Sequence, residues 1–135
     1  MADIVTQLSV HMENRPGALA DLTESLVDAG VNILAISVPD TGEFGTVRMF
    51  ADDVLEARSA LQEAGFPHAA VDVLAVELPH RPGALSQLAR LLADENIVIR
   101  YAYATNPLGG EYGLCIMRVD DIHRAQQVLD KKLTK

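Results

Sequence analysis

Hydrophobic and polar positions follow the same course twice along the chain. From Ile4 to Met12, apolar and polar residues alternate with a period of two, which predicts a strand. The next apolar residues recur at spacings of three and four and predict one stripe on a helix: Leu19, Leu22, Leu26 and Ala29. We expect Pro16 at the first position of this helix and Gly30 just beyond its end.

The rest of the first half continues the same way. The apolar run Val31–Val38 predicts a central strand, and Thr46–Ala51 predicts the next one. Asp52 or Asp53 then caps a second helix, and a fourth strand falls around Ala70–Val73. The order strand, helix, strand, strand, helix, strand is typical of an α+β, ferredoxin-like βαββαβ unit.

An internal repeat shows that this unit occurs twice. Arg15–Leu19 recurs unchanged as Arg81–Leu85, an offset of 66 residues (81 minus 15). We therefore predict one domain over residues 1–73 and a second over 70–135, with a shared strand at about 70–78. Too few residues follow the last helix for another strand, so the second unit is predicted to be truncated at its last strand.

Two motifs carry a resemblance to a known family. Glu13–Gly17 (Glu-Asn-Arg-Pro-Gly) followed by Gly30–Ile33 (Gly-Val-Asn-Ile) resembles the ACT domain, above all the serine-sensing ACT domain of phosphoglycerate dehydrogenases. The second copy repeats the pattern in Pro79–Gly83 and Asn96–Ile99. The resemblance to tandem ACT proteins implies two units side by side, with helices on one face of a shared antiparallel sheet. It also implies that a free amino acid binds between units.

The resemblance and the chemistry of the turns together suggest a ligand set. Asn14 and Asn32 stand where serine-binding members place side-chain amides, and backbone amides at a helix start attract a carboxylate. The loop of one copy would be completed by the second strand of the other, so the Asn14 turn would meet Val98 and Arg100. The predicted ligand residues are Asn14, Arg15, Pro16, Gly17, Ala18, Leu19, Asn32, His80, Gly83, Ala84, Val98 and Arg100.

Simpler roles also explain some of these residues. Asn14 could be a plain helix cap, and Arg15 and Arg81 could be exposed residues at helix starts. Because only the first copy keeps the asparagine, we expect Asn14→Ala to weaken binding more than His80→Ala.

Composition narrows the class of function. A net charge of −8 argues against nucleic-acid and anionic-membrane partners. The histidines are scattered, which argues against a metal site, and Cys115 lies in the apolar run Gly113–Met117 as a small buried hydrophobe. We find no signal peptide, apolar span, catalytic motif or cofactor motif, so we expect a cytoplasmic protein that is not an enzyme.

These observations predict a non-catalytic regulatory sensor that binds an amino acid and modulates a partner enzyme. The alternative is a structural or interaction subunit of an amino-acid metabolic enzyme, with a vestigial ligand site. We also expect a homodimer, because Val71, Val73 and Ala75 would form an apolar face open to water.

Overall fold

The chain forms two compact units in a computed structural model that describes residues 2–40, 42–106 and 108–133. The N-terminal unit comprises Thr6–Val71, and the C-terminal unit comprises Asp72–Lys135 together with Met1–Val5. The outermost positions of the predicted domain ranges, residues 1, 134 and 135, lie outside the described residues.

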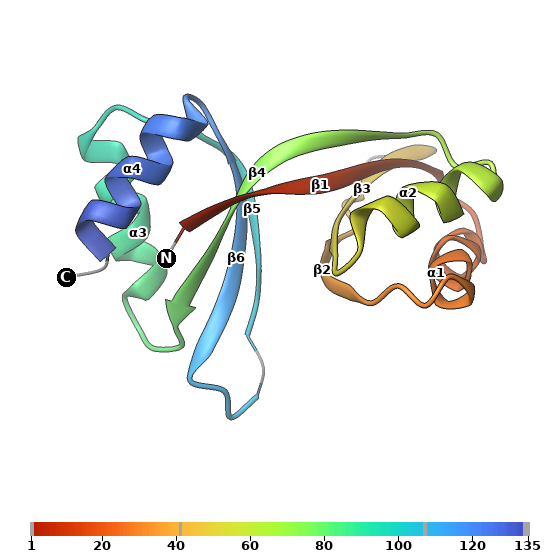
Figure 1. Cartoon of the computed structure of the whole chain (residues 1–135), viewed down its shortest axis with the longest axis horizontal. Coiled ribbons are helices and arrows are strands. Elements are labelled where there is room, and N and C mark those ends of the chain that lie inside the picture. The colour runs from red at the N-terminus through yellow and green to blue at the C-terminus, as the bar shows by residue number, and fades with distance from the viewer. Residues whose placement is uncertain (1, 41, 107, 134–135) are drawn as a thin grey trace. The chain divides into compact units, whose positions relative to one another are not determined.

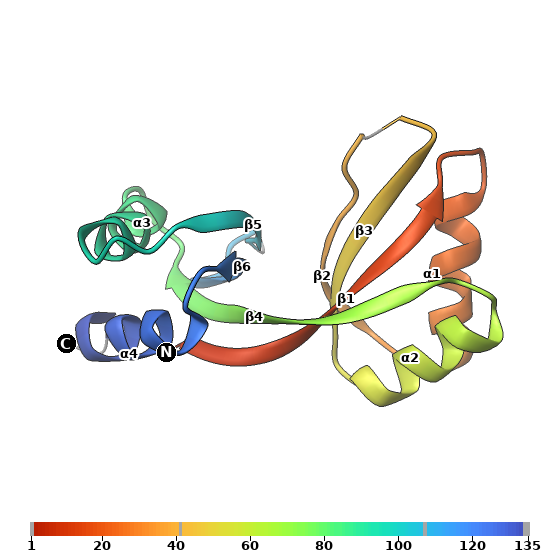
Figure 2. The same ribbon diagram turned by 90° about the horizontal axis from the view of Figure 1, so that it is seen from above.

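The N-terminal unit has the predicted βαββαβ order, and its strands lie in the order β2-β3-β1-β4. Both helices cover the same face of its strands (Figures 1 and 2). Its elements are β1 (Ala2–Glu13, from Thr6 onward), α1 (Ala18–Asp28), β2 (Ile33–Ser37), β3 (Phe44–Ala51), α2 (Val54–Glu63) and the first part of β4 (His68–Pro79). Asp53 caps α2, as predicted, by accepting a hydrogen bond from the Glu56 amide.

The C-terminal unit repeats the plan with strand order β1-β4-β6-β5. It is built from the rest of β4, α3 (Ala84–Asp94), β5 (Ile99–Thr105), β6 (Tyr112–Val119) and α4 (Ile122–Leu133). In the N-terminal unit, β3 pairs antiparallel with β1 and with β2. In the C-terminal unit, β6 pairs antiparallel with β4 and with β5, as in a ferredoxin-like sheet. The predicted α+β fold with two ferredoxin-like units is confirmed.

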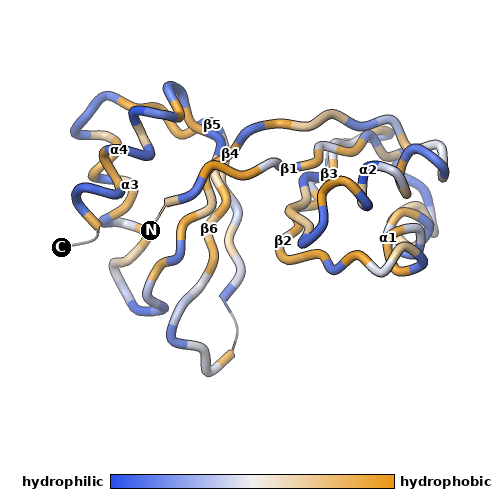
Figure 3. Tube along the Cα trace, in the orientation of Figure 1, coloured by the Kyte–Doolittle hydropathy of each residue, from blue (hydrophilic) through white to orange (hydrophobic). Residues whose placement is uncertain are grey.

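The helices pack through part of the stripe predicted from the sequence, since Leu19 is 39% exposed. Leu22 and Leu26 on α1, and Leu88 and Leu92 on α3, are completely buried in the core of their own unit. Figure 3 shows the helices alternating between hydrophobic and hydrophilic stretches, as one buried face requires. The core is aliphatic because the chain has few aromatic residues.

The start of each first helix differs from the prediction. Pro16 is not the first helical residue, because α1 begins at Ala18 and Gly17 has φ 83° and ψ −7°. The Ala18 amide donates to the Arg15 carbonyl over 3.1 Å, so Arg15–Ala18 is a type II turn with proline and glycine in the positions that this turn favours. Gly83 repeats the conformation at φ 91°, which explains why the motif recurs with glycine.

The first residues of the chain complete the C-terminal unit. Ala2 is 2% exposed in its core, its amide donates to Asp130 Oδ1 over 3.1 Å, and its carbonyl accepts from Gln126 Nε2 over 3.1 Å. The predicted range 1–73 assigned residues 2–5 to the first unit. They belong to the C-terminal one because β1 is long enough, at 12 residues, to supply both units, and no strand follows α4 within the described residues.

The inner strand β4 buries both of its faces over Val73–Val76. Leu74, Val76 and Leu78 lie in the core of the C-terminal unit. Val73 and Ala75, predicted to be open to water, are only 0% and 7% exposed within a single chain. The apolar face that motivated the homodimer is therefore already covered at these two positions.

Candidate functional site

The turn before α1 is fastened to the loop that precedes β3. The Asn14 amide donates to the Glu43 carbonyl over 2.6 Å, and the Asn14 side-chain Nδ2 donates to the Gly42 carbonyl over 2.8 Å. The side chain predicted to hold a ligand thus already contacts its own chain. Its Oδ1 atom is a hydrogen-bond acceptor suited to an ammonium group.

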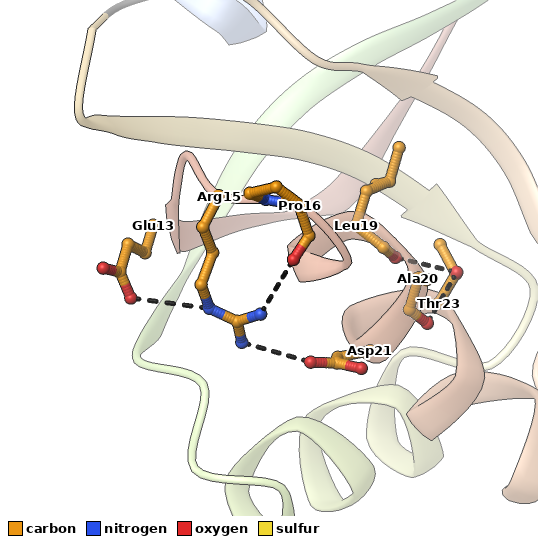
Figure 4. A network of polar contacts seen from close by, with 7 residues as sticks. All are labelled: Glu13, Arg15, Pro16, Leu19, Ala20, Asp21 and Thr23. Atoms are coloured by element: carbon orange, nitrogen blue, oxygen red, sulfur yellow. Dashed lines mark hydrogen bonds and ion pairs between the residues drawn. The ribbon is translucent and has the colours of Figure 1, made fainter.

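Arg15 is held by its own unit. Its guanidinium lies 3.6 Å from Glu13 and donates to Asp21 Oδ2 over 3.1 Å and to the Pro16 carbonyl over 3.2 Å (Figure 4). The Arg15 side chain is 46% exposed, so these contacts add little stability, but they do fix where its charge lies.

The backbone donors at the helix starts are fewer than predicted. The amides of Ala18 and Ala84 donate to the carbonyls of Arg15 and Arg81, and so are not open to a ligand. No side chain caps either helix at Gly17 or Gly83. The first amides after these turns, such as that of Leu19, keep the character of helix-start donors.

Asn32 lies at the other end of the N-terminal unit from Asn14. Its amide donates to Asp52 Oδ1, and its carbonyl accepts from the Asp52 amide, both over 3.0 Å. Asn14 comes directly after the strand residue that pairs with Phe44, at the first end of β3. Asn32 comes directly before the strand residue that pairs with Ala51, at the other end of β3. The eight residues of β3 separate these ends by about 23 Å, so one unit does not bring both asparagines to one ligand.

The C-terminal unit keeps the backbone contacts and changes the side chains. The His80 amide donates to the Glu111 carbonyl over 2.8 Å, as Asn14 does to Glu43, and the Val98 carbonyl accepts from Asp120 over 3.0 Å. Arg100, predicted as a ligand residue, donates from Nε and Nη2 to the two oxygens of Asp120 over 2.8 Å each. Its bidentate position is thus occupied by the chain itself.

The Arg100 contact lowers the pKa of Asp120, chiefly through the hydrogen bond, with smaller charge effects of Arg100 and Arg118. The ion pair between Arg100 and Asp120 stabilises the folded protein at pH values above the pKa that Asp120 has in the unfolded chain. This stabilisation is lost as the pH falls through the lowered pKa of Asp120 in the folded protein. We expect Arg100→Gln to raise the Asp120 pKa toward 3.8, as measured by NMR titration of the carboxyl carbon. Arg118→Gln, the matched control, should move it less; equal shifts would contradict this reasoning.

A small cavity opens beside the second turn. It has a volume of about 90 Å³ and lies within the C-terminal unit, between the end of β4, the start of α3 and the strands β5 and β6. Its lining residues are Leu78, Pro79, His80, Arg81, Ala84, Leu85, Ala104, Asn106, Gly113, Leu114 and Cys115. Of the predicted ligand residues, His80 and Ala84 meet here.

Sequence reasoning missed most of this lining. Cys115 is 1% exposed, which confirms its interpretation as a small buried hydrophobe, and burial raises the pKa of its thiol. Gly113 was the available signal, because glycine inside a strand often marks a close approach of another group. A Cβ on Gly113 would collide with Asn106 Oδ1.

Within 2–40, 42–106 and 108–133, no three His, Cys, Asp or Glu side chains gather as metal ligands. Over the same part of the chain, no helix combines the length and apolar character needed to cross a membrane.

A family model described as an ACT domain pair matches residues 3–134. The chain belongs to this family. The resemblance drawn from the two turn motifs is thereby confirmed, and each βαββαβ unit is an ACT unit. A comparison with curated protein sequences gives no match.

Solved structures share the fold of this ACT pair. A Bacteroides thetaiotaomicron protein aligns with TM-score 0.90 and 28% identity, over 98% of this chain and 90% of its own. The ligand-free regulatory subunit of aspartate kinase from Thermus thermophilus aligns with TM-score 0.68 and 15% identity, over 96% and 95%. The regulatory subunit from Thermus flavus aligns with TM-score 0.66 and 16% identity, over 97% and 94%. At these identities the aspartate kinase subunits show the fold alone.

Proposed function

We propose that this protein is a cytoplasmic, non-catalytic sensor that binds a free amino acid at an ACT strand-to-helix turn and modulates a partner enzyme. The observation that carries the proposal is the repeated type II turn, which places an arginine, a positive-φ glycine and an uncapped helix start side by side in each unit. Membership of the ACT pair family and the fold shared with aspartate kinase regulatory subunits support it.

The turn chemistry matches the two charges of an amino acid. Guanidinium groups and helix-start amides attract the carboxylate, and carbonyl oxygens accept from the ammonium. Nucleophilic catalysis receives no support from Cys115, because a buried thiol with a raised pKa stays protonated. The prediction that a second unit completes the site stays a prediction, as does the homodimer.

The alternative is a structural or interaction subunit with a vestigial site. One observation favours it: in the N-terminal unit, Asn14 and Arg15 use their polar groups on their own chain. Under this alternative the turns would only connect elements.

Calorimetric titration with each of the twenty amino acids tests the proposal. We expect one amino acid, or a group of similar ones, to bind with a dissociation constant in the micromolar range, which corresponds to about −8 kcal/mol. Such an affinity lets a sensor release its ligand as the pool falls. If none of the twenty binds to the folded protein at millimolar concentration, the structural alternative replaces the sensor.

A further inference from the structure

The two turns carry the same arginine in different electrostatic surroundings. Arg15 pairs with Glu13 and Asp21. The offset of 66 residues puts Pro79 in the place of Glu13 and Gln87 in the place of Asp21. Arg81 accordingly makes no ion pair or side-chain hydrogen bond within residues 2–40, 42–106 and 108–133.

Arg81 borders the cavity. Arg81 and His80 line it on the turn side, whereas Leu78 and Cys115 line it from the strands. Arg58 and Arg90 also make no ion pair among the described residues, so Arg81 is set apart by its place beside a cavity that Leu78, Leu85 and Cys115 line. A carboxylate from outside the chain would supply the missing partner, in the planar geometry that guanidinium favours.

Small side chains on β5 and β6 leave room for this cavity. Ala104 pairs with Cys115 across β5 and β6. At the offsets of 66 and 68 residues, the N-terminal unit carries Val38 and Val47 at these positions. That unit also ties its turn to the neighbouring loop through the Asn14 side chain, a hydrogen bond that His80 does not make among the described residues. The C-terminal turn is therefore the more open of the two.

The volume limits the occupant. The cavity has a volume of about 90 Å³, well below that of a typical drug-sized pocket. Leu78, Ala104 and Cys115 offer methyl, methylene and thiol surface to a ligand, with no charge on this side. A short aliphatic side chain fits this lining, whereas a charged one would find no partner of opposite charge on it.

We propose that the C-terminal unit binds a small aliphatic α-amino acid, of alanine to valine size, with its carboxylate on Arg81 and its side chain against Ala104 and Cys115. The inference rests on the proposed function and names its ligand class and its unit. It reverses the expectation from the sequence that the Asn14 turn is the principal site.

Two matched pairs of variants test the inference by calorimetry with alanine, valine, leucine, serine, lysine and phenylalanine. Arg81→Gln should weaken binding by about tenfold or more, and Arg15→Gln by less than about twofold. Ala104→Val, which restores the larger residue of the other unit, should weaken valine binding by about tenfold or more, because one methyl group in an apolar pocket discriminates on this scale. Ala102→Val, on the same strand and outside the cavity lining, should leave affinity unchanged.

Labelling of the single thiol gives an independent readout. Cys115 is 1% exposed and burial raises the pKa of its thiol, so its slow reaction with a small disulfide reagent reports on opening of the C-terminal unit. Bound alanine or valine should slow this reaction severalfold, and lysine or phenylalanine should not. Binding that is unchanged in Arg81→Gln, or that prefers lysine or phenylalanine, would overturn the inference and leave the sensor proposal standing. Binding of none of the twenty amino acids would remove the sensor proposal itself.

Discussion

Replacing Ala2 by glutamate is expected to cost the C-terminal unit about 3–5 kcal/mol of its free energy of unfolding. Ala2 is 2% exposed among the core residues of that unit, and its amide donates to Asp130. A glutamate there would place an unpaired negative charge beside an existing carboxylate in an apolar environment. A loss of this size is a large part of the stability of a small domain.

The three tyrosines make this loss measurable. The chain has no tryptophan, and Tyr101, Tyr103 and Tyr112 all belong to the C-terminal unit, so tyrosine fluorescence during urea unfolding reports on that unit alone. The neighbouring Asp3 is exposed, and Asp3→Ala should change the free energy of unfolding by less than about 0.5 kcal/mol. If Ala2→Glu proved as mild as Asp3→Ala, residues 2–5 would not be the strand that completes this unit.

Leu92→Ala is expected to destabilise the C-terminal unit by about 2–5 kcal/mol. Leu92 is completely buried between α3 and the strands of its unit. Truncation removes apolar contacts and leaves a void that a well-packed core fills only in part. Leu26 occupies the equivalent position on α1 with the same burial, so Leu26→Ala should cost the N-terminal unit a similar amount.

Two signals separate the effects of these variants. Circular dichroism reports on the helices of both units, whereas tyrosine fluorescence follows the C-terminal unit. Leu92→Ala should therefore lower the urea midpoint of the fluorescence transition. Val27, next to Leu26, is 70% exposed, and Val27→Ala serves as the surface control. A cost below about 1 kcal/mol for Leu92→Ala would show that this stripe is not the core contact.

Local sequence chemistry predicted the elements well and their junctions less well. The stripes that include Leu22 and Leu88 predicted the helices, because a period of 3.6 residues is set by the chain itself. Pro16 misled the prediction of the helix start, because a proline followed by a glycine suits a type II turn as well as a first helical turn. The positive φ of Gly17 decides between the two.

The candidate site was predicted only in part. The repeated turn located His80 and Arg81 at a strand end, but the sequence indicated neither the cavity nor its lining by Ala104 and Cys115. Spacing along the chain does not report which side chains already have partners. Arg100 binds Asp120, and Arg15 binds Asp21, through contacts between residues 20 and 6 positions apart.

The sequence by itself determined the repeat, the βαββαβ order, the apolar stripes and the family, because each depends on the spacing of residues along the chain or on a short local motif. Tertiary structure decided the rest. It assigned Ala2–Val5 to the C-terminal unit and set Asn14 and Asn32 at opposite ends of β3. It also placed Arg81 beside a cavity, with no acid partner among the described residues. These features depend on which distant side chains meet, and on how much volume they fill once the strands are paired.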